Sequence, residues 1–133
     1  MRLFITGAAG FIGGSIAKSL AEEGHTVIGL IRDPQQAEAL ETLGITPIVG
    51  SLDDSQLLKE QSQAADAVIN AASSDHLGAV QAIIEGLKGS NKVFLHTSGS
   101  SIVGDASGGL GTNNIFYEDK LPAPTEDKAA RVA

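Results

Sequence analysis

The sequence opens with MRLFITGAAGFIGG (residues 1–14), in which an apolar run, LFI, precedes three glycines spaced three residues apart. The apolar run predicts a buried strand, and apolar residues at helical spacing from 11 to 23 predict a helix directly after the glycines. Gly7 permits a tight turn, Gly10 lets the backbone approach a ligand, and Gly13 lets the helix pack closely on the sheet. A helix N-terminus offers N–H donors and partial positive charge, so the pattern indicates a phosphate-binding turn. The alternative is a glycine-rich structural turn that binds nothing.

Apolar runs and amphipathic stretches continue to alternate up to residue 95. Five strands that alternate with four helices predict an α/β fold, a doubly wound parallel sheet in the order 3-2-1-4-5. The ligand crevice of such a sheet lies between strands 1 and 4. Pro47 is best tolerated at a sheet edge, which agrees with the place of the third strand. The predicted strands are 3–5, 26–31, 45–49, 67–69 and 93–95, and the predicted helices are 11–23, 34–43, 53–62 and 79–89.

Aspartates stand where three of the four helices are expected to begin. A side-chain oxygen at this position accepts a backbone N–H of the first turn. Pro34 follows Asp33 directly, and a glutamine lies three residues after Asp33 and three residues after Asp53. Both features favour an N-cap at these aspartates. The expected caps are Asp33 for the second helix, Asp53 with Asp54 for the third, and Asp75 for the fourth.

Composition excludes several classes of function. A chain of 133 residues suits one compact domain. A net charge of −7 and an aromatic content of 4% argue against nucleic-acid and anionic-membrane partners. Without cysteine there are no disulfides or thiolate metal sites, and His25, His76 and His96 lack the spacing of a metal site or a catalytic triad. No apolar run approaches the length of a membrane span or has the form of a signal peptide, so we expect a cytoplasmic protein without a metal.

Three motifs carry a family resemblance: TGAAGFIGG (6–14), GHTV (24–27) and DAVINAA (66–72). They resemble the extended and atypical short-chain dehydrogenases/reductases, the NAD(P)-dependent epimerase/dehydratase superfamily. The resemblance covers residues 1–104 and implies a Rossmann-like fold, a nicotinamide dinucleotide and a small-molecule substrate. It divides the chain into a dinucleotide-binding domain, 1–112, and an irregular tail with the start of a helix, 113–133. The C-terminal part of the family fold is missing, so the chain is either a fragment or a naturally short protein.

The resemblance also implies a cofactor site. NAD-preferring members end strand 2 with an acidic side chain, whereas this chain has Ile31 there and Arg32 next. A guanidinium pairs with a 2′-phosphate, which favours NADP with NAD as the alternative, unless Arg32 is merely a solvated surface residue. Ser51 replaces the Asp that usually lies near the adenine. The expected cofactor-binding residues are Gly7, Gly10, Phe11, Ile12, Gly13, Arg32, Ser51, Leu52, Ala71, Ala72 and Thr97.

The catalytic pattern of the family is incomplete. Its members use a Tyr and, four positions later, a Lys on the same helix, with a Ser after strand 5. Tyr117 and Lys120 are three apart in an irregular, proline-flanked segment, and we interpret this spacing as coincidence. Ser98 and Ser100 are the candidate catalytic residues, and whether the chain is an enzyme is left open.

Two functions therefore follow from the sequence. The first is an NADP(H)-binding protein of the nicotinamide-dependent reductase or sugar epimerase/dehydratase type. The alternative is a non-catalytic dinucleotide-binding module, or a truncated fragment that needs a partner or missing sequence for activity. An exposed sheet edge at the fifth strand favours association into a homo-oligomer.

Overall fold

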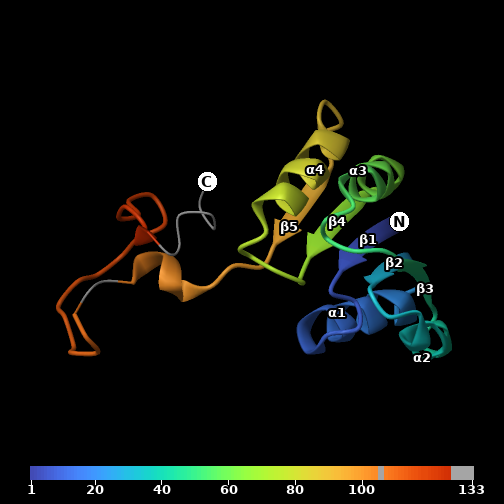
Figure 1. The fold of residues 1–133 in the computed structure, drawn as a ribbon, viewed down its shortest axis with the longest axis horizontal. Coiled ribbons are helices and arrows are strands. Elements are labelled where there is room, and N and C mark those ends of the chain that lie inside the picture. The colour runs from blue at the N-terminus through green and yellow to red at the C-terminus, as the bar shows by residue number, and fades with distance from the viewer. Residues whose placement is uncertain (105–106, 127–133) are drawn as a thin grey trace.

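A five-stranded parallel sheet forms the centre of the computed structural model, which describes residues 1–104 and 107–126 (Figure 1). The strand order is β3-β2-β1-β4-β5, as the alternation of apolar and amphipathic stretches predicts. The strands are β1 (Arg2–Thr6), β2 (Thr26–Ile31), β3 (Ile45–Val49), β4 (Ala67–Asn70) and β5 (Val93–His96). The α-helices are α1 (Phe11–Glu22), α2 (Ala37–Thr42), α3 (Ser55–Ala64) and α4 (Leu77–Leu87), and the 3-10 helices are η1 (Pro34–Gln36) and η2 (Ser100–Val103).

The register brings the carboxyl ends of the central strands to one edge of the sheet. Thr6, the last residue of β1, is paired with Leu30 of β2 and with Asn70 of β4. The strand order reverses at this point: from β1 the chain continues to β2 and β3 on one side of β1, and then crosses to β4 and β5 on the other side. Such a switch point is where open α/β sheets leave a crevice for ligands.

Helices cover both faces of the sheet, α1 and α2 on one and α3 and α4 on the other (Figure 1). Alternate residues of β1 point to opposite faces, so Leu3 and Ile5 pack in the first core and Phe4 in the second. Removal of these side chains from water is the main force that holds the layers together. The first core contains Leu3, Ile5, Ala8, Ala17, Val27, Ile31, Leu40, Ile45, Ala67 and Ile69. The second contains Phe4, Ile28, Leu30, Leu58, Ala65, Val68, Ala79, Ile83 and Leu87.

The helix starts differ from expectation at three places. Asp33 caps the 3-10 helix η1 by accepting from Gln35 N, and α2 begins only afterwards. Asp54 alone caps α3, because its carboxylate lies three residues before Leu57 N and accepts from it at 3.0 Å, so Asp53 is not part of the cap.

The fourth helix is capped by a histidine instead of the expected Asp75. His76 Nδ1 accepts from Ala79 N at 3.1 Å, because His76 occupies the N-cap position directly before Leu77. A neutral imidazole nitrogen serves here as the acceptor that a carboxylate usually provides.

The segment after β5 leaves the sheet. Beyond η2, residues 107–126 run away from the α/β body in irregular conformation (Figure 1). The division of the chain at residue 112 stays a prediction, and the start of a helix expected within 113–133 falls partly outside the described residues. Within residues 1–104 and 107–126, no helix combines the length and apolar character needed to cross a membrane.

Candidate functional site

A cavity of about 480 Å³ opens at the switch point between β1 and β4. Four segments form its walls: the glycine turn after β1, the end of β2 with η1, the loop after β3 and the loop after β4. This is the crevice that the strand order predicts. The lining residues are Gly7, Ala9, Gly10, Leu30, Ile31, Arg32, Gln36, Ser51, Leu52, Asp53, Ala71, Ala72, Ser73 and His76.

The glycine turn is packed so tightly that two of its positions exclude a side chain. Gly7 has a φ of +75°, and a Cβ there would lie 2.7 Å from the carbonyl oxygen of Ala71. A Cβ on Gly13 would lie 2.2 Å from the carbonyl oxygen of Gly7. Gly10 differs, since its φ of −85° suits any residue and its Cβ would meet only the Gly7 oxygen, at 3.2 Å. Gly10 therefore keeps the cavity clear, whereas Gly7 and Gly13 allow the turn to pack on the sheet.

The N-terminus of α1 is available to an anion. Its N-cap, Gly10, lines the cavity and has no side chain to accept a first-turn N–H, and its first turn has no acidic residue. By contrast, Asp54 and His76 cap α3 and α4. Uncapped N–H groups and the positive end of the helix dipole favour a bound phosphate. The backbone at this wall therefore suits a pyrophosphate.

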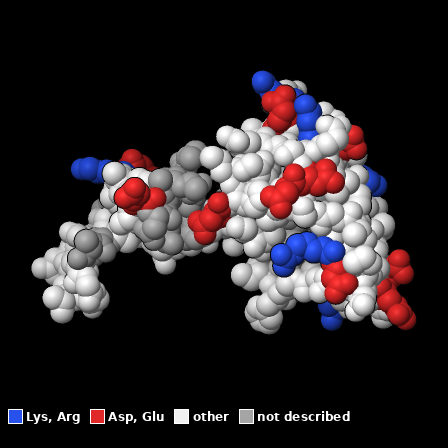
Figure 2. All heavy atoms as spheres, in the orientation of Figure 1, with Lys and Arg blue, Asp and Glu red and all other residues white. Residues whose placement is uncertain are grey.

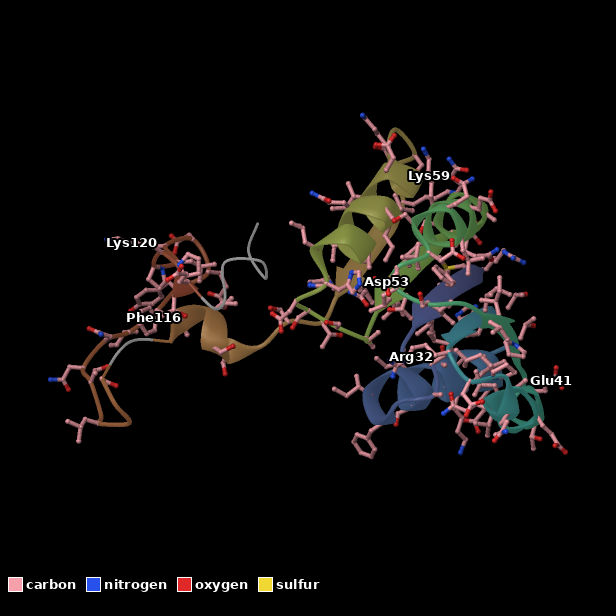
Figure 3. The ribbon with its side chains drawn as sticks, viewed as in Figure 1. Arg32, Glu41, Asp53, Lys59, Phe116 and Lys120 are labelled. Carbon is pink, nitrogen blue, oxygen red and sulfur yellow. The ribbon has the colours of Figure 1, made fainter. Side chains whose placement is uncertain are left out.

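Arg32 is a cation at the same cavity that forms no ion pair within the described part of the chain. It follows β2 directly, is exposed, and lies at the edge of the sheet that also holds Asp53 (Figure 3). Among the described residues it has no carboxylate partner, whereas Lys18 and Lys59 pair with glutamates at 3.7 Å. Acidic and basic side chains are interspersed over the α/β body on the face shown in Figure 2. In a chain of net charge −7, an arginine with no carboxylate partner among the described residues is thus placed to receive an anionic ligand group.

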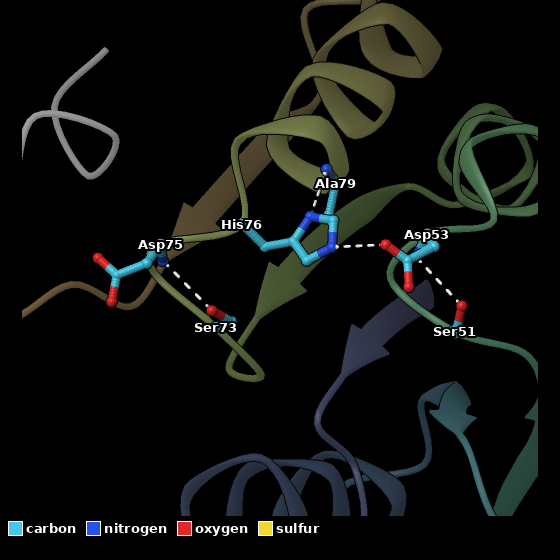
Figure 4. A network of polar contacts seen from close by, with 6 residues as sticks. All are labelled: Ser51, Asp53, Ser73, Asp75, His76 and Ala79. Atoms are coloured by element: carbon cyan, nitrogen blue, oxygen red, sulfur yellow. Dashed lines mark hydrogen bonds and ion pairs between the residues drawn. The ribbon is translucent and has the colours of Figure 1, made fainter.

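The opposite wall carries a polar network that joins two loops (Figure 4). Asp53 Oδ1 lies 3.1 Å from His76 Nε2, and the Asp53 N–H donates to Ser51 Oγ at 3.1 Å. Because His76 Nδ1 accepts from the Ala79 N–H, its hydrogen resides on Nε2, which donates to the Asp53 carboxylate. The pair ties the loop after β3 to the start of α4. Sequence reasoning missed this pair, since both residues were interpreted as local features of separate helix starts or as structural.

A buried asparagine fixes the loop after β4. Asn70 is 1% exposed; its Oδ1 accepts from Thr6 Oγ1 and its Nδ2 donates to Ser73 O and His96 Nδ1, each at 3.0 Å. A buried amide with satisfied hydrogen bonds holds its neighbours in one arrangement. The backbone of Ala71 and Ala72 thereby packs directly against Gly7 of the glycine turn. Asn70 lies in the motif DAVINAA (66–72), but the sequence does not indicate that its side chain fixes the loop. Only its contacts with Thr6 of β1 and His96 of β5 in the structure do so.

The structure brings most expected cofactor residues together. Gly7, Gly10, Arg32, Ser51, Leu52, Ala71 and Ala72 all line the cavity. Phe11 instead lies at a neighbouring groove of about 400 Å³ between α1 and α2, with 93% of its surface exposed. Ile12, Gly13 and Thr97 are outside the lining, as are the candidate catalytic residues Ser98 and Ser100, which follow β5 and are exposed. Among residues 1–104 and 107–126, no three histidine or acidic side chains are grouped to hold a metal.

Tyr117 and Lys120 lie far from this edge of the sheet. They form an isolated bridge in a tight turn, with Lys120 N donating to Tyr117 O at 3.1 Å. Figure 3 shows Phe116 and Lys120 in the segment that leaves the α/β body. The helical Tyr–Lys arrangement of the resembled family is therefore not made by these two residues.

A doubly wound parallel sheet with a glycine turn and an open helix N-terminus at its switch point defines a dinucleotide-binding domain of the Rossmann type. Comparison with known families agrees: residues 7–129 match a family model described as NAD(P)H-binding. The chain thus belongs to this NAD(P)H-binding family, and its cofactor is a nicotinamide dinucleotide. The resemblance inferred from the glycine motif is confirmed for both fold and cofactor class.

Known proteins extend the comparison. An uncharacterized protein of Schizosaccharomyces pombe, C2A9.02, is 37% identical over 137 residues, which covers 95% of this chain and 46% of that protein. A phenylcoumaran benzylic ether reductase of Ginkgo biloba, IRL1, is 38% identical over 108 residues, covering 72% of this chain and 35% of the reductase. The structure of MoeE5 in complex with UDP-glucose and NAD shares the fold, with a TM-score of 0.73 at 23% identity over 99% of this chain and 46% of MoeE5. The chain spans less than half the length of these relatives.

Proposed function

We propose that this chain is the NADP(H)-binding part of a nicotinamide-dependent reductase or sugar epimerase/dehydratase. One observation carries the proposal: an uncapped helix N-terminus and Arg32, which has no ion-pair partner among the described residues, line the same cavity. These two features suit the two anionic groups of NADP, the 2′-phosphate and the pyrophosphate. The relatives support the activity class, since the Ginkgo biloba relative is a reductase and MoeE5 was determined with UDP-glucose and NAD.

The residues of the cavity have distinct roles in this proposal. The first-turn N–H groups of α1 bind the pyrophosphate, and the absence of a side chain at Gly10 lets it approach. Arg32 pairs with the 2′-phosphate. The bound cofactor would supply hydride transfer at nicotinamide C4, while the protein binds and orients it. Asn70 positions the loop at Ala71 and Ala72 that forms the wall beside the glycine turn.

Preference for NADP over NAD follows from charge. A hydrogen-bonded pair with a charged group contributes about 1.5–3 kcal/mol, which corresponds to roughly 10- to 150-fold in affinity. Arg32 is exposed, so solvent and salt screen the pair and the lower end applies. NAD, which lacks the 2′-phosphate, is expected to bind more weakly at the same site.

For the substrate, we propose only a broad chemical class. A small molecule is the expected substrate, with Ser98 and Ser100 offering hydroxyls after β5, and we place the protein in the cytoplasm without nucleic-acid or membrane partners. We also propose that the chain divides into a dinucleotide-binding domain, residues 1–112, and a tail, residues 113–133. One observation favours a non-catalytic dinucleotide-binding module instead: Tyr117 and Lys120 meet in a turn rather than on a helix.

Calorimetry of the purified chain with NADP and NAD tests the proposal. We expect saturable binding of both nucleotides at one site, with NADP bound about tenfold more tightly. Absence of binding by either nucleotide would contradict the assignment of the cavity. Equal affinities would retain the dinucleotide site and reject the role of Arg32.

A further inference from the structure

The buried amide of Asn70 uses its full capacity for hydrogen bonds. Its oxygen Oδ1 accepts from Thr6 Oγ1 and from the Ala72 N–H, the latter at 3.3 Å. Its Nδ2 donates one hydrogen to Ser73 O and directs the other at His96 Nδ1, each at 3.0 Å. An amide has two donor hydrogens and two acceptor lone pairs, so all four are engaged. The side chain thus joins β1, the loop after β4 and the end of β5.

The backbone of the loop fixes which way round this amide lies. Ser73 O can only accept a hydrogen, and the Ala72 N–H can only donate one. In the flipped amide, Oδ1 would face the carbonyl oxygen of Ser73, and the Nδ2 hydrogens would face the Ala72 N–H. Asn70 therefore directs a hydrogen at His96. His96 Nδ1 is the acceptor, and the hydrogen of the neutral imidazole resides on Nε2.

A protonated imidazole cannot make this contact. Both ring nitrogens of a histidinium carry a hydrogen, so Nδ1–H would confront the Nδ2 hydrogen of Asn70. Turning the amide to relieve this conflict sets like groups against Ser73 O and the Ala72 N–H. We propose, resting on the function proposed above, that neutral His96 is a positioning residue for the dinucleotide and that its protonation releases the loop after β4 and weakens binding.

The loop after β4 connects His96 to the cofactor cavity. Ala71, Ala72 and Ser73 line the cavity beside the glycine turn, whereas His96 does not. The loop and the turn are in close contact, since a Cβ on Gly7 would lie 2.7 Å from the carbonyl oxygen of Ala71. Movement in packing this tight is transmitted to the neighbouring segment. A change at His96 therefore reaches the turn that receives the pyrophosphate.

The surroundings of His96 leave it able to gain a proton. Its ring centroid lies 5.8 Å from that of Phe94, which packs against the second core, yet His96 is only half-buried. The charged residues on the surrounding elements are Asp75 and His76 of the loop after β4, since β4, the first two turns of α4 and residues 97–104 contain none. Histidines change charge between about pH 5 and 8, whereas carboxylates ordinarily stay ionised there. His76 is therefore the other group on these elements that titrates in this range.

Calorimetric titration of the chain with NAD at about pH 7.5 and about pH 5.5 tests the proposal. NAD is the probe because the 2′-phosphate of NADP itself gains a proton in this range. The wild type should bind NAD roughly tenfold more weakly at the lower pH, because a buried donor loses its acceptor. Equal affinities at the two pH values would overturn the proposal. Absence of binding at the higher pH would instead overturn the proposed function on which it rests.

Two variants of His96 separate the contact from the charge. In His96→Asn the amide oxygen can replace Nδ1 as acceptor and does not titrate. This variant should bind NAD within about twofold of the wild type at the higher pH and lose little affinity at the lower pH. His96→Leu has no acceptor and should bind NAD roughly tenfold more weakly at both pH values. A fall in affinity with pH that persists in His96→Asn would place the titrating group elsewhere and overturn the proposal.

His76→Asn is the matched control for a second histidine at the same edge of the sheet. Asparagine keeps a good N-cap on α4 in place of the His76 ring. The ratio of NAD affinities at the two pH values should stay at the wild-type value in this variant. Loss of the pH dependence in His76→Asn to the same extent as in His96→Asn would assign the proton to the wall of the cavity and not to the Asn70 contact, and would overturn the proposal.

Discussion

Replacing Arg32 with alanine should abolish the preference for NADP while leaving NAD binding nearly unchanged. Arg32 lines the cavity, has no carboxylate partner among the described residues, and follows the last buried residue of β2, Ile31. Its removal deletes one cation without taking away a packed side chain. The change should therefore act on the 2′-phosphate alone.

The size of the effect follows from the exposure of the side chain. A charge-assisted pair contributes about 1.5–3 kcal/mol, and screening at an exposed site favours the lower figure. We expect NADP affinity to fall by about tenfold. Arg32→Lys should retain part of the attraction, because a lysine offers a point charge but not the two parallel N–H groups of a guanidinium.

Calorimetry with NADP and NAD at low and physiological salt measures this prediction. Raising the ionic strength from about 0.01 M to 0.15 M shortens the Debye length from about 30 Å to 8 Å, so the preference of the wild type should shrink with salt. Lys59→Ala is the matched control, since Lys59 lies away from the cavity and pairs with Glu85. An equal loss of NADP and NAD affinity in Arg32→Ala would refute the reasoning, because it would show that Arg32 supports the fold or a phosphate common to both nucleotides.

Three further predictions concern the glycine turn and catalysis. Gly10→Val should still fold, because φ at this position is −85°, with some loss of stability from the 3.2 Å contact of its Cβ with the Gly7 oxygen, yet lose NADP binding by filling the space at the pyrophosphate; unchanged affinity would contradict the placement of the phosphates. Gly7→Ala should lower the free energy of unfolding by more than Gly24→Ala, both measured by urea denaturation. Each position has a positive φ, which costs about 1–2 kcal/mol for alanine, but only Gly7 also meets a carbonyl oxygen at 2.7 Å, so equal losses would refute the packing argument. The 133-residue chain alone should oxidise NADPH slowly against carbonyl substrates or nucleotide sugars, since a general acid typically contributes about 10²–10⁴-fold and the Tyr117–Lys120 turn does not supply the helical pair. Rapid NADPH oxidation, followed by absorbance, that persists in Tyr117→Phe would show that other groups provide the proton, and rapid oxidation lost in this variant would assign the role to Tyr117.

Local signals in the sequence were sufficient for the sheet and its order. Apolar residues recur with different periods in strands and in helices, so the alternation of strands and helices could be predicted without coordinates. The glycine turn between the first strand and the first helix, together with that alternation, predicted the 3-2-1-4-5 order. Arg32 could be identified as a candidate cofactor-binding residue because it directly follows the end of β2, which the sequence also predicts. Each of these features depends on residues near one another in the chain.

The other half of the site depends on residues that are distant in the sequence. Asp53 and His76 are 23 positions apart, and Asn70 and His96 are 26 apart. Their contacts arise only because the parallel sheet brings the loops after β3 and β4, and the last residues of β4 and β5, to one edge of the sheet. The sequence alone therefore determined the glycine turn and the cation at the same cavity, whereas tertiary structure decided which polar groups line the rest of the cavity, since hydrogen bonds between distant segments depend on distances that no local pattern encodes.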